Sequence, residues 1–362
     1  MCSSLLTTLF LSLLQLQFAI AAQEYDPEFA RFAFEHAAAA YSRDPSKCLA
    51  KYYGTYILRQ GNVSCDHFHD ECLYYISVSP MYIVIAFGGT HSRLQLIAEI
   101  LAGMAEPKAE FIAGGSVQRY FNAAFKSVWK DMWHLLRRTL ETNNTRPIIF
   151  TGHSLGGSLA SLASSHFAYF YASRGIDSVD IRLITFGEPR TGNRDYAYAH
   201  DILVPVSFRV VHRGDLVPHL PSCLINIRTF ACSSRFSFGP YHHGLEIWYP
   251  ENMTETSPFR ICLGQPQNED QTCRSSSFAY LLFISKKKNF IFQFFVKNFV
   301  GDSIFTAMVI TATTPLKIIY TILANMSANM VYPDAREAEI LPGKTSRKQK
   351  PLNHGFVIIS LL

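Results

Sequence analysis

One serine in this sequence is bracketed by glycines in a way that suits a nucleophile. The stretch GHSLG at 152–156 follows the apolar run 147–150 and precedes small and apolar residues at helical spacing. Glycines two positions before and after Ser154 allow a strand to turn sharply into a helix, with the hydroxyl above the sheet. The next amide then lies at a helix N-terminus. The motif also arises by chance in glycine-rich loops, but the flanking strand and helix patterns favour a catalytic serine.

A serine hydroxyl needs a histidine to take its proton and a carboxylate to orient that histidine. Asp215, in FRVVHRGDLVPHLP, follows a predicted strand, where a loop could present it at the sheet edge. His242 and His243, in SFGPYHHGLEIWYP, lie in a loop flanked by glycine and proline before a strand-like run. The order Ser, Asp, His is that of α/β-hydrolases. Asp215 could instead only form a turn, and local sequence allows either histidine to be the base.

Helical and strand patterns alternate between residues 24 and 273, which predicts an α/β chain with a central sheet. Helices are expected over 28–42, from Ser116 to about Thr142, and after the serine turn. We read the aromatic residues of the long helix as core. Strands are expected near 53–60, 73–79, 82–87, 147–150, 181–186 and 206–211.

Composition and the first residues indicate an exported globular protein. The chain has 362 residues, of which 48% are hydrophobic and 17% charged, enough to bury a sizeable core. Residues 1–22 carry no charge, are rich in leucine and end in a small-x-small pattern, which predicts a secretory signal peptide. A short N-terminal membrane anchor is the alternative. Sequons at Asn62, Asn143 and Asn252 agree with export.

Seven cysteines remain after the signal peptide, and export makes disulfides the default expectation. Cys65 and Cys72 enclose two aspartates and two histidines, but their spacing fits no standard zinc site, so a small disulfide loop is favoured. The remaining late cysteines form two close pairs, Cys223 with Cys232 and Cys262 with Cys273. We expect Cys262 or Cys273 to reach Cys48, which leaves one cysteine unaccounted for.

The composition changes abruptly after Cys273. Residues 274–362 contain eleven Lys or Arg against four Asp or Glu, a surplus larger than the net +5 of the whole chain. The preceding residues are therefore slightly acidic, and no nucleic-acid partner is expected. The apolar run from Ile304 to Asn325 is interrupted by Lys317, so it could associate with a membrane, pack as an extra region or lie outside the folded enzyme. The predicted organisation is a signal peptide at 1–22, a hydrolase domain at 23–273 and an atypical tail at 274–362.

Several motifs together resemble one family. FGGT at 87–90, TGHSLGG, TFGEPRTGNRDYA, VVHRGDLVPHLP and YHHGLEIW occur in the order and approximate spacing of the class 3 lipases. These are the fungal-type triacylglycerol lipases and their secreted animal relatives, and the resemblance covers about residues 28–273. It implies an α/β-hydrolase fold with a central, mostly parallel sheet and a lid over the active site.

The resemblance also implies roles for particular residues. Ser154 would be the nucleophile, Asp215 the triad acid and His242 the base. His242 is preferred to His243 because Glu246 and Trp248 follow it at the register of the family motif.

The oxyanion hole and the lid follow from the same resemblance. The amides of Thr90 and Leu155 would bind the oxyanion, with the Thr90 hydroxyl assisting. Gly88 stands where arginine is usual. Residues 91–113 occupy the place of the lid, although the same apolar spacing also fits a helix permanently packed on the core.

These observations predict a secreted serine hydrolase that cleaves the ester bonds of acylglycerols at a lipid interface through a Ser-Asp-His triad and an acyl-enzyme. The alternative is a catalytically weak or inactive lipid-binding or surface protein on the same fold. A third possibility, a membrane-tethered hydrolase, depends on residues 290–325. No metal or organic cofactor is expected. Acyl-chain specificity and oligomeric state are left open by the sequence.

Overall fold

A computed structural model of the chain describes most of residues 25–311. The described ranges are 25–64, 71–90, 108–141, 146–176, 179–224, 232–233, 235–254, 256–264, 268–273, 278–286, 289–297 and 305–311. The predicted signal peptide and residues 91–107 of the predicted lid lie outside them. The chain divides into two compact units, Met1–Phe278 and Ala279–Leu362.

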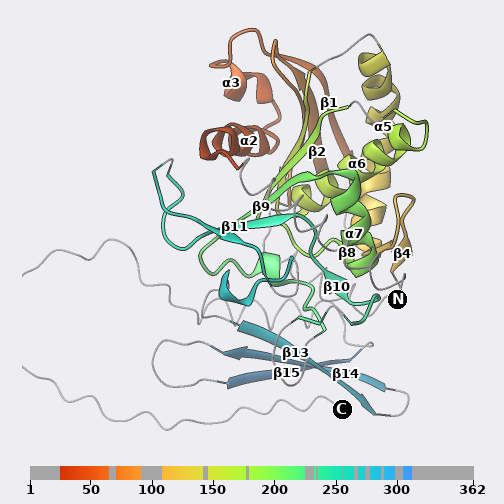
Figure 1. The fold of residues 1–362 in the computed structure, drawn as a ribbon, viewed down its shortest axis with the longest axis vertical. Helices are drawn as coiled ribbons and strands as arrows, with labels where there is room; N and C mark the ends of the chain where they lie inside the picture. The colour runs from red at the N-terminus through yellow and green to blue at the C-terminus, as the bar shows by residue number, and fades with distance from the viewer. Residues whose placement is uncertain are drawn as a thin grey trace, which may run out of the picture. The chain divides into compact units, whose positions relative to one another are not determined.

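The first unit is built on an eight-stranded mixed sheet with the order β1-β2-β3-β6-β7-β9-β11-β12 (Figure 1). The central strands from β3 to β11 are parallel, β2 and β12 join them antiparallel, and β1 pairs antiparallel with β2. The strands are β1 (Tyr56–Ser64), β2 (Glu71–Val78), β3 (Ile83–Phe87), β6 (Ile148–His153), β7 (Ile181–Phe186), β9 (Val206–His212), β11 (Leu245–Tyr249) and β12 (Arg260–Cys262). Strand β3 is buried throughout, as expected for a strand covered on both faces.

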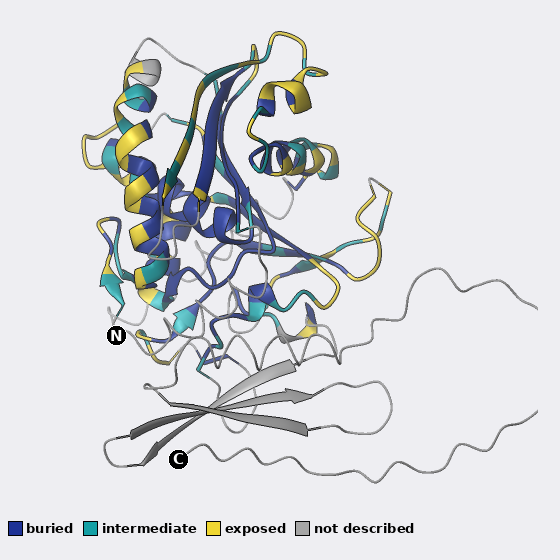
Figure 2. Cartoon of the chain, turned by 180° about the vertical axis from the view of Figure 1, so that it is seen from behind, coloured by how far each residue is buried: buried dark blue, intermediate teal, exposed yellow. Residues whose placement is uncertain are grey.

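Helices cover both faces of this sheet (Figure 1). Helices α2 (Pro27–Ala39) and α3 (Pro45–Leu49) lie on one face, and α5 (Arg119–Glu141) and α6 (Leu155–Ala172) lie on the other. Helix α2 begins where the Asp26 side chain accepts a hydrogen bond from the amide of Glu28 and a proline occupies the first turn. Figure 2 shows the resulting pattern, in which buried residues fill the sheet and the inner faces of the helices.

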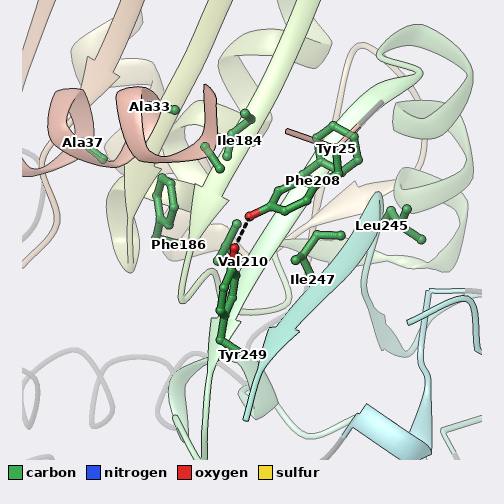
Figure 3. Packing of buried hydrophobic residues seen from close by; sticks show 11 residues of the cluster. Tyr25, Ala33, Ala37, Ile184, Phe186, Phe208, Val210, Leu245, Ile247 and Tyr249 are labelled. Atoms are coloured by element: carbon green, nitrogen blue, oxygen red, sulfur yellow. Dashed lines mark hydrogen bonds between the residues drawn. The ribbon is translucent and has the colours of Figure 1, made fainter. Parts of the chain in front are cut away.

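The core on the α2 side forms because small helix residues allow close approach to the sheet. Ala33 and Ala37 of α2 face Phe186, Val210 and other apolar residues of β7, β9 and β11 (Figure 3). The hydroxyls of Tyr25 and Tyr249 share a hydrogen bond of 3.0 Å at the edge of this cluster. This bond joins the chain segment before α2 to the end of β11.

Two elements differ from the sequence-based expectation. The helix predicted from Ser116 begins at Arg119, because Ser116–Val117 forms strand β5 in a second small sheet. That sheet has the order β10-β8-β5-β4, with β10 (Pro240–Tyr241), β8 (Gly192–Asn193) and β4 (Ala109–Glu110). Helix α7 (Arg194–Leu203) was not expected, and it begins where the Asn193 side chain accepts from the amide of Tyr196. The aromatic residues Phe121, Phe125 and Trp129 of α5 are buried, as predicted.

The cysteines confirm the close pair Cys223 and Cys232, whereas the expected bond from Cys262 or Cys273 to Cys48 is wrong. Cys223 is bonded to Cys232 and Cys262 to Cys273. Cys72 is also disulfide-bonded, and its predicted partner Cys65 lies outside the described residues. Cys48 is a free, exposed thiol, so the expected bond between Cys48 and a late cysteine is not formed, because the late cysteines pair with their sequence neighbours.

The second unit contains a three-stranded sheet in the order β13-β14-β15. Its strands are β13 (Phe278–Lys286), β14 (Asn289–Lys297) and β15 (Phe305–Thr311), and β14 and β15 are antiparallel. Among the helices that the structure describes, none has the length and apolar character needed to cross a bilayer.

Candidate active site

Ser154 occupies a sharp turn between β6 and α6, with φ 58° and ψ −124°. A non-glycine residue in such a conformation costs about 1–3 kcal/mol and must be held by its surroundings. The Ser154 amide donates to the carbonyl of Phe186 in β7 at 2.9 Å, and the Ser154 carbonyl accepts from the amide of Gly157 at 2.9 Å. The Ser154 hydroxyl makes no capping hydrogen bond to α6. Hydrogen bonds therefore hold both the amide and the carbonyl of Ser154, while its side chain does not cap the helix.

The two glycines are required because three main-chain segments meet at this turn. A Cβ on Gly152 would overlap the carbonyl of Gly156, and a Cβ on Gly156 would overlap the carbonyl of Phe87 at the end of β3. Both obstacles are backbone atoms, so a side chain could enter only by displacing the sheet or the helix. The predicted reason for glycine at both positions is confirmed.

The two predicted oxyanion donors follow neighbouring parallel strands. Leu155 is the first residue of α6, so its amide has no partner within the helix. Thr90 follows β3, which pairs in parallel with β6. The Thr90 hydroxyl oxygen is buried and has no hydrogen-bond partner among the described residues. These positions are compatible with two donors at the same edge of the sheet.

The glycine that replaces the usual arginine has a structural reason. A Cβ on Gly88 would lie 2.8 Å from the carbonyl oxygen of Ala40, just after α2. The Gly88 amide also donates to the carbonyl of Leu73 at 2.8 Å. The loop before Thr90 is thus packed directly against backbone, and an arginine would require that backbone to shift.

Asp215 lies in the loop after β9, close to the ends of β6 and β7. A Cβ placed on Gly187, which follows β7, would be 2.9 Å from Asp215 Oδ2 and 3.6 Å from Nε2 of His153. Strands β6, β7 and β9 are parallel neighbours, so their carboxyl ends meet at one edge of the sheet. Asp215 Oδ1 also accepts from the amide of Val217 at 3.2 Å. The carboxylate therefore faces the elbow region and forms a turn as well.

His242 is buried and its contacts lead to the loop that carries Asp215. Its Nε2 lies 2.7 Å from the carbonyl oxygen of Pro218, and its amide donates to Glu269 Oε1 at 3.1 Å. The other ring nitrogen, Nδ1, is buried and has no hydrogen-bond partner among the described residues. Burial and the positive charges of Arg209 and Arg190 hold the pKa of His242 well below its usual range. The ring is therefore neutral in the folded protein.

His243 is buried against α6 instead. Its Nε2 lies 2.7 Å from the hydroxyl of Ser161 and 2.9 Å from Glu188 Oε1. The Glu188 carboxylate also accepts from the hydroxyls of Thr185 and Thr191 at 2.7 and 2.8 Å. Glu188 thus binds three partners, and His243 belongs to this buried polar group.

Neither candidate base is brought to the serine. Both histidines precede β11, which runs parallel to β9, so they lie toward the amino ends of these strands. Ser154 and Asp215 instead follow the carboxyl ends of β6 and β9. His243 Nδ1 lies 3.5 Å from the hydroxyl of Ser207, the second residue of β9. Within the described part of the chain, His242 and His243 make no hydrogen bond to Ser154 or Asp215. The assignment of the base to His242 stays a prediction.

Several buried charged residues near the site were given no part in the site from the sequence, although Glu246 served to fix the register of His242. Arg190 forms an ion pair with Glu269, and each side chain is 3% exposed. Arg209, 1% exposed, donates to the His243 carbonyl at 2.6 Å and pairs with Glu246. Arg190 lies in the motif GEPRTGN. Two charged residues within this glycine- and proline-containing segment were the available signal of a structural role. Arg209 and Glu246 lie in strands with no sequence mark of their burial.

One buried cluster has the composition of a metal site but is already fully hydrogen-bonded. Candidate ligand atoms of His200, Asp201 and His243 lie within 4.8 Å of one another. Each of their polar atoms is bound by protein. The partners are Ser161, Ser165, Ser207, Glu188, Gly244 and Asn268. A metal ion would have to displace these bonds, so the cluster is a hydrogen-bond network.

Comparison with known proteins finds lipases among the relatives of this chain. The family described as Lipase (class 3) matches residues 84–225. The chain is 35% identical over 268 residues to Lipase ZK262.3 of Caenorhabditis elegans, which covers 70% of this chain and 74% of the relative. It is 29% identical over 188 residues to a lipase of Rhizopus niveus, covering 52% of this chain but only 43% of that relative. The crystal structure of a lipase from Rhizopus microsporus var. chinensis superimposes with a TM-score of 0.55 at 25% identity, covering 69% of this chain and 81% of that structure.

The sheet order, the helices on both faces and the serine turn after β6 define an α/β-hydrolase fold. Within that class, the chain belongs to the class 3 lipase family.

Proposed function

We propose that this protein is a carboxylic ester hydrolase that cleaves acylglycerols, with Ser154 as its nucleophile. The observation that carries the proposal is the strained backbone of Ser154, held between β6 and α6 at positive φ. Strain of this kind persists where the surrounding structure maintains it, and it is concentrated at functional sites. Family membership supports ester hydrolysis as the reaction class.

In the proposed reaction, Ser154 Oγ attacks the ester carbonyl carbon and its proton passes to the base. The carbonyl oxygen becomes an oxyanion, which the amides of Leu155 and Thr90 would bind. The alcohol leaves with the proton from the base, and an acyl group remains on Ser154. Water then attacks this acyl-enzyme, releases the fatty acid and restores the serine. Asp215 is the proposed carboxylate that orients the base and stabilises its charged form.

The base is the part of the proposed triad on which sequence register and described contacts disagree. The register favours His242, but its Nε2 is bound to the carbonyl of Pro218. A role as base would require the ring to leave that carbonyl and to reach Ser154. The low pKa of His242, caused first by burial, also makes the buried ring a weak acceptor of protons.

A second candidate function is a lipid-binding protein of low or absent turnover on the same fold. It is favoured by one observation, the absence of a hydrogen bond between His242 and Ser154 within the described residues. A serine without a base would retain the fold and the site but would react slowly.

We propose that the protein is exported from the cell. Export is supported by the signal-like residues 1–22, by the disulfides and by exposed sequon residues Asn62 and Asn252. One fungal relative, 29% identical over 119 residues, is named a secreted mono- and diacylglycerol lipase.

A fluorophosphonate probe tests the proposal directly, because only an activated serine is phosphonylated. The purified full chain should be labelled and should release fatty acid from tributyrin, whereas Ser154→Ala should do neither. Absence of both labelling and hydrolysis in the parent, with the fold intact by circular dichroism, would favour the lipid-binding candidate.

A further inference from the structure

The loop that follows Asp215 is held by donors from outside it. The loop contains only a short 3-10 helix, Val217–His219. Four consecutive carbonyl oxygens accept hydrogen bonds from Arg190 or His242. They belong to Pro218, His219, Leu220 and Pro221.

Arg190 supplies three of these four bonds. Its Nη1 donates to the carbonyls of His219 and Pro221 at 2.7 and 3.1 Å, and its main-chain amide donates to the carbonyl of Leu220 at 2.7 Å. A guanidinium has five N–H donors in a fixed plane, so one side chain can hold two loop carbonyls and still bind a carboxylate. Arg190 uses all five donors, since Nε and Nη2 bind Glu269 and Nη2 also donates to Cys232 Sγ at 3.5 Å.

Glu269 fixes the orientation of Arg190 and also contacts His242. Its two oxygens accept from Arg190 Nε and Nη2 at 2.7 Å each, a bidentate pair. Oε1 accepts in addition from the main-chain amide of His242 at 3.1 Å. A buried ion pair adds little net stability compared with apolar packing, so geometric control of the loop is the better explanation for this one.

His242 supplies the fourth bond. A carbonyl oxygen can only accept, so Nε2 must carry the proton and donate to Pro218 at 2.7 Å. The lone pair of the neutral ring is then on Nδ1, which is buried and has no partner among the described residues. In this arrangement the useful property of His242 is its N–H donor.

We infer that Arg190, Glu269 and His242 form a clamp that fixes the loop from Asp215 to Pro221 and so positions the Asp215 carboxylate. The inference rests on the proposed function, in which Asp215 is the triad acid. The other end of the loop is fixed by β9, where the Asp215 amide donates to the carbonyl of His212 at 3.1 Å. With both ends held, the carboxylate keeps a defined place beside Gly187 and His153.

His242 is then a positioning residue and need not take a proton, and two substitutions separate these roles. In His242→Gln the side-chain amide can still donate to the Pro218 carbonyl, but it cannot act as a base. His242→Ala removes both properties. Hydrolysis of p-nitrophenyl butyrate, a soluble ester that avoids the lipid interface, is measured for the full chain carrying each change. His134→Ala, an exposed residue of α5, is the matched control and should equal the parent.

For a positioning role, kcat of His242→Gln should stay within about 10-fold of the parent, and His242→Ala should lose about 10²-fold with KM little changed. Equal losses of about 10³-fold or more in both variants would overturn the inference and make His242 the base.

Hydrogen exchange supplies a readout that does not depend on catalysis. Amides of residues 213–221 should exchange faster in His242→Ala and in Glu269→Gln than in the parent, and His242→Gln should resemble the parent. Unchanged exchange in both His242→Ala and Glu269→Gln would overturn the clamp even in an active enzyme. A parent that shows no hydrolysis and no fluorophosphonate labelling would refute the proposed function, whereas the exchange result would still decide the clamp.

Discussion

The glycines and the serine of the elbow lie within five consecutive residues, whereas the clamp joins residues up to 79 positions apart. In the elbow, the backbone turn and two glycines hold Ser154 at positive φ, and the residue itself is buried. In the clamp, an arginine, a glutamate and a histidine from separate loops together hold one other loop. The difference suggests that the nucleophile depends on local backbone geometry, while the position of Asp215 depends on distant buried polar contacts. The two regions should therefore respond differently to substitution.

The largest effect is expected at the elbow. Ser154→Ala should lower kcat on a short-chain ester by about 10⁴-fold or more, because the nucleophile is removed. Alanine has the same strain at positive φ as serine, so the urea midpoint of unfolding should stay close to that of the parent. Steady-state kinetics and urea unfolding measure the two quantities. Near-normal activity would remove Ser154 from the mechanism.

Asp215→Asn tests the catalytic role of the carboxylate separately from its turn. The amide oxygen can still accept from Val217, so the loop should persist, but the charge that stabilises the protonated base is lost. We expect kcat to fall by about 10⁴-fold with little change in stability. Asp180→Asn, a surface change beside Arg182, is the control. An Asp215→Asn enzyme as active as this control would show that Asp215 only forms the turn.

His243→Ala should affect stability more than catalysis. It removes one hydrogen-bond partner of the buried Glu188 carboxylate, a change that should cost about 1–3 kcal/mol. Urea unfolding should show that loss, and part of it should be recovered in the double variant with Glu188→Gln. If stability were unchanged but kcat of the folded enzyme fell about 10³-fold, His243 would be the base.

The smallest expected effect concerns pH and the buried ring of His242. Its pKa is held low in the folded protein, while in the unfolded chain it should be about 6.5. Below pH ~6.5 the unfolded chain therefore binds a proton that the folded protein does not, and stability falls as pH falls. The slope for one such group approaches about 1.4 kcal/mol per pH unit.

His242→Gln should remove this contribution, so its unfolding free energy should fall less steeply between pH 6 and 5. Urea unfolding at pH 7, 6 and 5 measures the difference. The buried His200, with a lowered pKa, and Asp201 and Glu246, with pKa values raised by burial, remain in both proteins. They cancel in the comparison, and equal slopes would mean that His242 titrates normally in the folded state.

Much of the fold could be predicted because its signals are local. Buried strands such as 82–87 and 181–186 are continuous apolar runs, and the helix after Ser154 has regular apolar spacing. Helix α7 and strand β5 were missed because their formation depends on partners. Val117 pairs with Gly192 of β8, and α7 begins from the side chain of Asn193 in that same strand.

The sequence by itself determined where the elbow lies, because the apolar strand, the two glycines around Ser154 and the following helix are consecutive in the chain. The carbonyls of Phe87 and Phe186 that meet the turn come from the neighbouring strands β3 and β7. The sequence also placed Asp215 at the correct edge, since the residues after parallel strands share one edge of a sheet. Only the tertiary structure decided where the two histidines lie. Their ring nitrogens bind Pro218, Ser161 and Glu188, and these contacts depend on how distant loops pack in a buried polar interior. Spacing along the chain carries no information about that packing.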